Sequence, residues 1–531
     1  MFIIKLKCFT WNADGHKSEN KTCASVVKYV FLLCGVIFIS FNTHSQGRNN
    51  MWLLGVQNIL DPNTTSIRAT VDFSSGSAVV SPSSRKMKFI ETQANISDTN
   101  GNLLMSSNGV WIANATGDTM MNGNGLNPNG FTSTWGNSSL GSLPLVFGNV
   151  FLPMPGDSNL YILLHMTANS NIPSLGSSEL YSTIIDISND NGLGGVVSKN
   201  TIIFSDTLSW GISACKHANG RDWWVTALKD DSNYIITILL TPSGFGNPIY
   251  QSFTNKISEL GTVAHPVFSP DGNKFACATG KPAGSGYDNN VNVFDFDRCT
   301  GLFSNHQRIH NPDSSFAIGC AFSPNSKYLY TCAVGHIYQT NLVSVLLSPQ
   351  LVATYDGFIS VQGTYFYTMF LAADNRIYVT SMTSVVHQHV INYPDSAGMA
   401  CDVQQHSLQI PCLNSGSVPN HPNYFLGAAS GTICDSLTTS IHESKFSLKK
   451  PLSISPNPAT NFITVNAMNM NGSKATLNIY NSVGELIGSR NLNIYGGYAT
   501  QDIYIETLPA GIYIVRLEGE RDVFVGKFVK E

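Results

Sequence analysis

The sequence predicts an all-β protein: a β-propeller of about seven blades, with six or eight as alternatives, followed by a small C-terminal β-sandwich. Three observations predict this fold class. Charged residues make up only 12% of the chain and 45 residues are glycine, a composition that suits turns and disfavours helix interiors. One turn-and-strand pattern recurs at intervals of roughly 50 residues. The C-terminal part alternates apolar and polar residues, as half-buried strands do.

The 531 residues are too many for one ordinary domain. The apolar run from Tyr29 to Phe41 is shorter than the roughly 20 residues of a membrane span, and lysines precede it (Lys5, Lys7, Lys17, Lys21 and Lys28). We therefore expect a signal peptide over residues 1–45 with a long basic n-region, and no transmembrane segment after its removal. The propeller is expected over 46–435, a linker over 436–450 and the sandwich over 451–531.

Net charge and cysteine usage limit the partners and the compartment. A formal net charge of −4 provides no broad basic surface, so nucleic acid and anionic membranes are not expected partners. Of the 11 cysteines, three precede residue 46. The other eight suit an exported chain with some disulfides, whose pairing the spacing leaves open. Cys277 and Cys332 lie in similar Cys-Ala-x-Gly contexts, which predicts equivalent, buried strand positions in two repeats.

The repeated turn is clearest in Phe268-Ser269-Pro270-Asp271-Gly272 and Phe322-Ser323-Pro324-Asn325-Ser326. Proline fixes φ, and glycine or asparagine allows the positive-φ corner that joins two antiparallel strands. Related turns give six corner positions, at residues 101, 156, 220, 272, 326 and 375. One such blade cannot bury both its faces, so a closed ring of blades is predicted. Residues before 101 and after 379 could supply a shared closing blade.

The turn sequences resemble the WD40-like repeats of secreted bacterial β-propellers. The body as a whole resembles an uncharacterised family of exported Bacteroidetes propellers, which has no settled activity to transfer. Further segments carry the second resemblance: 71–76, 97–104, 120–126, 217–225, 294–301 and Val418-Pro419-Asn420-His421-Pro422-Asn423-Tyr424. The resemblance implies a propeller fold and an extracytoplasmic location.

The tail resembles the type A C-terminal sorting domain of proteins exported by the type IX secretion system of Bacteroidetes. The resemblance rests on an entry motif, a glycine-tyrosine strand and a basic end, carried by Pro456, Asn457, Pro458, Gly511, Tyr513, Lys527 and Lys530. It implies that the tail engages the type IX machinery, and that the protein reaches the cell surface or the medium through the periplasm. An adhesive sandwich domain is the alternative.

Candidate metal ligands are few. His387 and His389 alternate on an expected strand, so their side chains would share one side, a spacing that suits two metal ligands. A third ligand would have to come from elsewhere, such as His336 or His421. The alternative is an ordinary polar strand face. Asp98, Asn100 and Asn102 resemble a short calcium loop but lack the glutamate of a full EF-hand loop, so no cofactor is expected, with calcium as the alternative.

No catalytic motif is present: HExxH, a Walker loop and GxSxG are all absent from the sequence. Trp111, Trp210, Trp223 and Trp224 could stack against sugars or pack inside the blades. The leading hypothesis is therefore a secreted binding or interaction module, for a glycan or an envelope protein. The alternatives are a propeller enzyme, such as a lactonase, lyase or glycan hydrolase acting at the central channel, and an accessory part of the gliding or secretion machinery.

Overall fold

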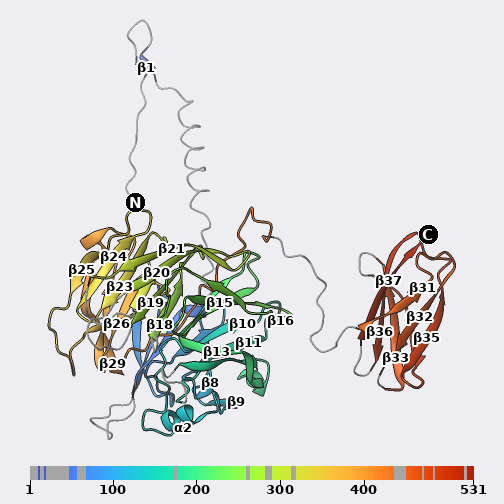
Figure 1. Ribbon diagram of the computed structural model, residues 1–531, viewed down its shortest axis with the longest axis horizontal. Coiled ribbons are helices and arrows are strands. Elements are labelled where there is room, and N and C mark those ends of the chain that lie inside the picture. Colours follow the sequence, from blue (N-terminus) through green and yellow to red (C-terminus); the bar gives the residue numbers. More distant parts are fainter. Residues whose placement is uncertain are drawn as a thin grey trace. The chain divides into compact units, whose positions relative to one another are not determined.

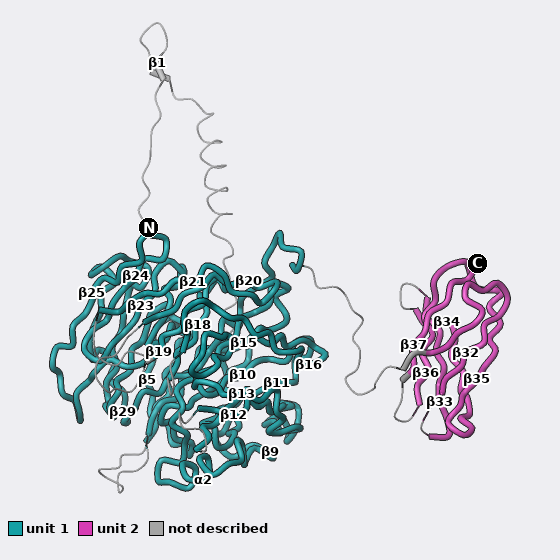
Figure 2. Tube along the Cα trace, viewed as in Figure 1, with its two compact units in different colours: residues 1–437 teal, residues 438–531 magenta. Residues whose placement is uncertain are grey.

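The computed structural model describes residues 10–11, 17–18, 47–56, 67–170, 176–258, 263–280, 290–312, 319–435, 450–468, 470, 472–481, 485–519 and 523–531. The chain forms two compact units, Met1–Leu437 and Thr438–Glu531 (Figure 2). Apart from the short antiparallel pair β1 (Thr10–Trp11) and β2 (Lys17–Ser18), the expected signal peptide lies outside the described residues. Within the described ranges, no helix has the length and apolar character needed to cross a bilayer.

The described part of the first unit is a β-propeller of seven blades by its strand pairing. Figure 1 shows its strands. Blades 2 to 7 each run as an antiparallel meander from the central channel outward. Blades 2 to 4 contain β6 (Ala94–Ser97), β7 (Leu103–Ser107), β8 (Trp111–Asn114) and β9 (Thr119–Asn124); β10 (Asn149–Pro153), β11 (Leu160–His165), β12 (Ser177–Asp186) and the first part of β13 (Gly195–Lys216); and the rest of β13, β14 (Trp223–Lys229), β15 (Tyr234–Thr241), β16 (Gly244–Phe245) and β17 (Ile249–Ser252).

Blades 5 to 7 have the same order. They contain β18 (Val263–Phe268), β19 (Lys274–Gly280), β20 (Asn290–Asp297) and β21 (Leu302–His310); β22 (Gly319–Phe322), β23 (Tyr328–Ala333), β24 (His336–Asn341) and β25 (Gln350–Thr354); and β26 (Phe366–Leu371), β27 (Ile377–Ser381), β28 (Val385–Ile391) and β29 (Val403–Asn414). Short helices connect or precede the strands: η1 (Gly47–Asn49), α2 (Gly130–Gly136), η2 (Asp190–Gly192) and η3 (Gly398–Cys401). Asn129 caps α2, because its side chain accepts from the Thr132 amide.

The predicted turns join the first and second strands of blades 2 to 7. All six corner residues have positive φ, between 60° and 92°, as the turn chemistry requires. The turns of blades 5 and 6 also match bond for bond: Ser269 N donates to Lys274 O and Ser323 N donates to Tyr328 O, each at 2.9 Å. In an antiparallel meander the third turn returns to the same end of the blade. Six corners therefore surround one mouth of the channel.

Cys277 and Cys332 were expected at equivalent strand positions of two blades, and this expectation is wrong by one residue. Both lie buried in the second strand of a blade. Matching the turns aligns Lys274 with Tyr328, so Cys277 corresponds to Thr331 rather than to Cys332. Because side chains alternate along a strand, the two thiols belong to opposite faces of their blades.

Blade 1 closes the ring with three strands: β3 (Met51–Leu54), β4 (Arg68–Asp72) and β5 (Val79–Ser83). Trp52 of β3 packs edge-on against Phe370 of β26, with ring centroids 6.4 Å apart, which joins blade 1 to blade 7. On its other side, Leu53 belongs to a buried cluster with Phe89 and Ala113. Apolar burial on both faces therefore holds the three described strands of blade 1 in the ring.

The described part of the second unit contains two facing sheets, as in a β-sandwich. One has the strand order β30-β37-β36-β33-β34 and the other β31-β32-β35. Their alternating apolar side chains form one buried core. The strands are β30 (Lys450–Pro451), β31 (Ser453–Ser455), β32 (Phe462–Met468), β33 (Lys474–Tyr480), β34 (Leu486–Asn493), β35 (Tyr498–Tyr504), β36 (Gly511–Gly519) and β37 (Val523–Lys530).

Candidate functional site

After blade 7, residues 415–427 pass through the channel along the innermost strands; we call this segment the channel strap. It contains no regular strand, and its side chains bond to backbone carbonyls facing the channel. Asn420 Nδ2 donates to Ile212 O at 2.7 Å, and His421 Nε2 donates to Asn95 O at 2.8 Å. The Tyr424 hydroxyl donates to Phe151 O at 2.9 Å. The strap thereby pairs buried polar groups of blades 2, 3 and 4.

The strap also completes the closure of the ring. The Gln93 side chain donates to Leu53 O of β3 and accepts from the Ser417 hydroxyl of the strap. One amide side chain therefore connects blade 1, the start of blade 2 and the strap. The expectation of a closing blade shared by the two ends of the propeller is wrong: the described strands of blade 1 all precede residue 101. The segment after blade 7 contributes hydrogen bonds beside blade 1 instead.

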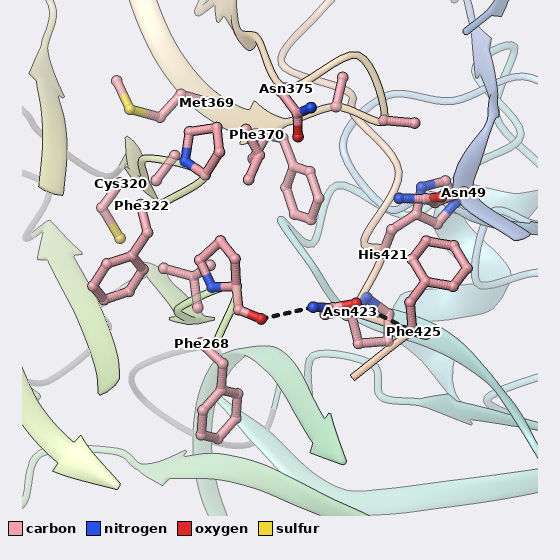
Figure 3. A pocket seen from close by; sticks show the side chains of 18 of the residues that line it. Asn49, Phe268, Cys320, Phe322, Met369, Phe370, Asn375, His421, Asn423 and Phe425 are labelled. Carbon is pink, nitrogen blue, oxygen red and sulfur yellow. Dashed lines mark hydrogen bonds between the residues drawn. The ribbon is translucent and has the colours of Figure 1, made fainter. Parts of the chain in front are cut away.

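A cavity of about 490 Å³ lies between the strap and blades 5 to 7. Its volume falls in the range of small-ligand sites. Figure 3 shows the labelled residues of the blades on one side and His421, Asn423 and Phe425 of the strap on the other. The lining consists of Asn49, Asn50, Val267, Phe268, Pro270, Cys320, Ala321, Phe322, Pro324, Met369, Phe370, Leu371, Ala372, Ala373, Asn375, His421, Pro422, Asn423 and Phe425. We call it the mouth cavity.

The repeated turns build the wall of the mouth cavity. Pro270, Pro324 and Asn375 come from the first turns of blades 5, 6 and 7. Asn423 Nδ2 donates to Pro270 O at 2.7 Å (Figure 3), while its Oδ1 accepts from the Phe425 amide at 3.0 Å. Both functional groups of Asn423 are thus used to hold the strap against blade 5, which sets the position of Phe425 at the cavity.

The mouth cavity is uncharged at neutral pH. None of its described lining residues is Asp, Glu, Lys or Arg. Burial lowers the pKa of His421 to about 4, so its imidazole is neutral. Burial raises the pKa of the Cys320 thiol to about 12, and its Sγ donates to His265 O at 3.2 Å. With a pKa of about 4 the His421 imidazole is a weak base, and Cys320 is a thiol rather than the nucleophilic thiolate at pH 7, so neither group is activated for catalysis.

The predicted histidine pair lies elsewhere, on β28. His387 Nδ1 lies 3.0 Å from the Ser360 hydroxyl. Both nitrogens of buried His389 are engaged, Nε2 with Thr364 O at 2.8 Å and Nδ1 with the His406 amide at 3.0 Å. His421 lies in the channel strap instead. The described residues contain no group of three or more His, Cys, Asp and Glu side chains arranged to hold a metal ion.

The calcium-like loop and the tryptophans have structural contacts. The Asp98 carboxylate accepts from the Asn100 and Asn102 amides, at 2.8 and 2.9 Å, and so closes its own turn. Trp223 and Trp224 are buried, and their indole N–H groups donate to Pro153 O and Arg298 O. These two tryptophans therefore pack inside the propeller and provide no stacking surface for sugars.

In the second unit, the residues of the predicted sorting motif lie close together. Asn457 Nδ2 donates to Lys527 O at 3.0 Å, and its Oδ1 accepts from the Val529 amide at 2.9 Å. The last strand also pairs with β36, placing Gly511 opposite Lys530. The Tyr513 ring stacks on Phe528 at 5.3 Å. The entry turn, the glycine-tyrosine strand and the basic end thus form one structural element.

Residues 453–531 match the family described as the secretion system C-terminal sorting domain. The protein is therefore an exported cargo. It carries the sorting domain of the type IX secretion system, which directs it to the cell surface or the medium through the periplasm.

Other comparisons add little to this assignment. No curated protein matches the chain. Among solved structures, hydrazine synthase from Kuenenia stuttgartiensis is similar over 66% of this chain and 91% of its own, at 10% identity and a TM-score of 0.34. A functionally unknown protein from Desulfotomaculum acetoxidans is similar over 70% and 99%, at 9% identity and a TM-score of 0.37. Such TM-scores support no inference about activity, and the propeller assignment rests on strand topology.

Sequence reasoning missed most of the mouth cavity. In the sequence, the turn residues of blades 5 to 7 are recognisable as repeat elements, whereas the segment from Val418 to Tyr424 carries a family resemblance that does not indicate its position in the fold. The signal in that segment is its two prolines, Pro419 and Pro422, which break the strand alternation seen elsewhere. A proline-interrupted segment after the last blade indicates that the chain leaves the sheets at this point. It does not indicate which part of the propeller the segment then contacts.

Proposed function

We propose that the protein is an exported propeller that acts as a binding module, with its ligand site in the mouth cavity. The observation that carries this proposal is the uncharged lining of a cavity built from four phenylalanines, three prolines and asparagine side chains. Such a lining favours an uncharged ligand with an apolar surface, held by burial of that surface and by a few amide hydrogen bonds.

A propeller enzyme is the second candidate, and the chemistry of the mouth cavity supports it less well. Hydrolysis or elimination needs a general acid or base whose pKa lies near the operating pH. The cavity contains one neutral imidazole, with its pKa lowered to about 4, and a thiol with its pKa raised to about 12. Propeller enzymes with convergent carboxylates at the channel have a different kind of lining.

The test uses the full chain and Nile red, an uncharged apolar dye that fluoresces when buried. We expect saturable dye binding, weakened at least tenfold by Ala373→Trp, which places an indole at the cavity wall. Ile359→Ser, a change at an exposed residue that does not line the cavity, is the control and should leave binding unchanged. Equal dye binding by Ala373→Trp would contradict the assigned site. Turnover of a lactone or polysaccharide that Ala373→Trp abolishes would establish the enzyme instead.

A further inference from the structure

Exposed apolar side chains lie in two surface turns of blades 6 and 7. Val343, Val345 and Leu346 lie in the turn between β24 and β25, with exposed fractions of 71%, 107% and 79%. Tyr393 and Met399 lie between β28 and β29, at 61% and 71%. We call these five residues the apolar rim. Both turns join the third and fourth strands of a blade.

The apolar rim and the mouth cavity lie at the same end of the propeller. In an antiparallel meander, the turn after the first strand and the turn after the third strand emerge at the same end of the sheet. The first turns of blades 6 and 7 supply Pro324 and Asn375 to the cavity. The rim turns of these two blades therefore share that end.

Hydrogen bonds hold the blade 7 rim turn against blade 6. The Asn325 amide, next to Pro324 of the cavity wall, donates to Asp395 Oδ1 at 3.0 Å. The buried Gln339 side chain of β24 donates to Ser396 O and accepts from the Gly398 amide, each at 2.7 Å. Met399 is the residue directly after Gly398, which Gln339 holds, and its short helix η3 also contacts β25 of blade 6. The blade 7 part of the rim is thus held in place before any partner binds, which lowers the entropic cost of binding there.

We propose that the mouth cavity and the apolar rim form one docking surface for another protein, which inserts an uncharged apolar side chain into the cavity. This proposal rests on the proposed function and specifies the class of ligand. The chemistry of the surface selects the occupant: an uncharged cavity disfavours charged groups, because their burial without a counter-charge is costly. A small sugar or metabolite held in the cavity would leave the five rim side chains in water, whereas a protein also covers the rim.

The arrangement fits the usual anatomy of protein interfaces. Binding energy concentrates where an anchoring side chain fills a pocket, and surrounding contacts exclude water from it. Here the cavity would accept the anchor, and Val345, Leu346 and Met399 would contact the partner beside it, at the same end of blades 6 and 7. Clustered exposed apolar residues of this kind mark interaction sites more often than isolated ones do.

The test screens the full chain on an array of random nine-residue peptides, with a neutral glycan array in parallel. Peptides that bind should be enriched in Phe, Leu, Ile, Met or Trp and depleted in charged residues. We expect the affinity for the selected peptides to fall at least tenfold in the double variant Val345→Ser/Leu346→Ser and also in Ala373→Trp. Ile359→Ser/Val361→Ser is the matched control, because it removes two exposed apolar residues from the segment between β25 and β26. This control should retain full affinity. Melting temperatures of all variants check folding.

Several outcomes would overturn the proposal. Peptides enriched in charge, or binding that neither test variant weakens, would contradict the docking surface. If neutral glycans bind, Ala373→Trp abolishes that binding and no peptide binds, the protein partner is refuted and the proposed function stands. A dimer of the full chain that Val345→Ser/Leu346→Ser dissociates in analytical ultracentrifugation would show that the rim binds a second copy instead. Absence of saturable Nile red binding by the wild-type chain, together with absence of peptide binding, would contradict both proposals.

Discussion

The disulfide between Cys299 and Cys434 offers the clearest quantitative prediction. Cys299 lies in the turn after β20, and Cys434 lies just beyond the channel strap, 135 residues later. The bond therefore encloses blades 6 and 7, part of blade 5 and the whole strap. In the chain-entropy account, closing a loop of this length removes about 5 kcal/mol of unfolded-state freedom. Measured values of about 2–4 kcal/mol are typical, so we expect a loss in that range when the bond is absent.

The assay is urea unfolding of the full chain followed by tryptophan fluorescence, for the wild type and for Cys299→Ser/Cys434→Ser. The double variant should unfold at lower urea, with an equal or steeper slope because its unfolded chain is no longer cross-linked. Adding dithiothreitol should lower the wild type to the level of the variant and leave the variant unchanged, which controls for the serine substitutions themselves. The entropic reasoning is refuted if removal of the bond changes the unfolding free energy by less than about 1 kcal/mol, below the usual range.

Three further predictions concern His421, Glu91 and Trp52. Burial lowers the pKa of His421 to about 4, so the imidazole takes up a proton more readily in the unfolded chain than in the folded one. The free energy of unfolding should therefore fall by up to about 3 kcal/mol from pH 6.5 to pH 4. His421→Gln should reduce that loss in urea titrations. Burial raises the pKa of Glu91 to about 7, so the free energy of unfolding should fall as the pH rises from 4.5 to 7. The Glu91→Gln side chain can still accept a hydrogen bond from Tyr367. This variant should be more stable than the wild type at pH 8 and equally stable at pH 4. Trp52→Ala should cost about 3–5 kcal/mol in the same assay, because it opens the packing between blades 1 and 7.

The blade architecture could be predicted from the sequence because its signals are local. A positive-φ corner flanked by apolar runs needs only neighbouring residues, and all six corners lie where the spacing placed them. Residues of three of these turns, Pro270, Pro324 and Asn375, also line the cavity, so the repeat pattern located part of the site without indicating a site. The one-residue error for Cys277 and Cys332 has a local cause as well, since the strands after the two turns carry the similar motifs one position apart.

The strap and the histidine contacts could not be predicted, because distant pairings decide them. His421 bonds to Asn95, which is 326 residues away, and Asn420 bonds to Ile212. Alternation along β28 describes the spacing of His387 and His389 but not their partners; the carbonyl of Thr364, which engages His389, comes from the loop before blade 7. Whether a polar side chain makes a structural hydrogen bond or is free to contact a ligand depends on partners from other blades, which a local sequence pattern does not reveal.

The sorting motif leads to a last prediction, which concerns export. Asn457 fixes the final strand through Lys527 O and Val529 N, so Asn457→Ala removes both bonds while leaving the two flanking prolines. We expect reduced surface delivery with accumulation in the periplasm, measured by protease accessibility of intact cells. The matched control is Asn491→Ala, which removes an exposed asparagine on β34 that accepts from Thr476, and it should export normally. Deletion of residues 451–531 should retain the protein in the periplasm. Surface delivery of the deleted chain would refute the sorting role, whereas normal export of Asn457→Ala alone would show that the machinery does not require this fixed position of the final strand.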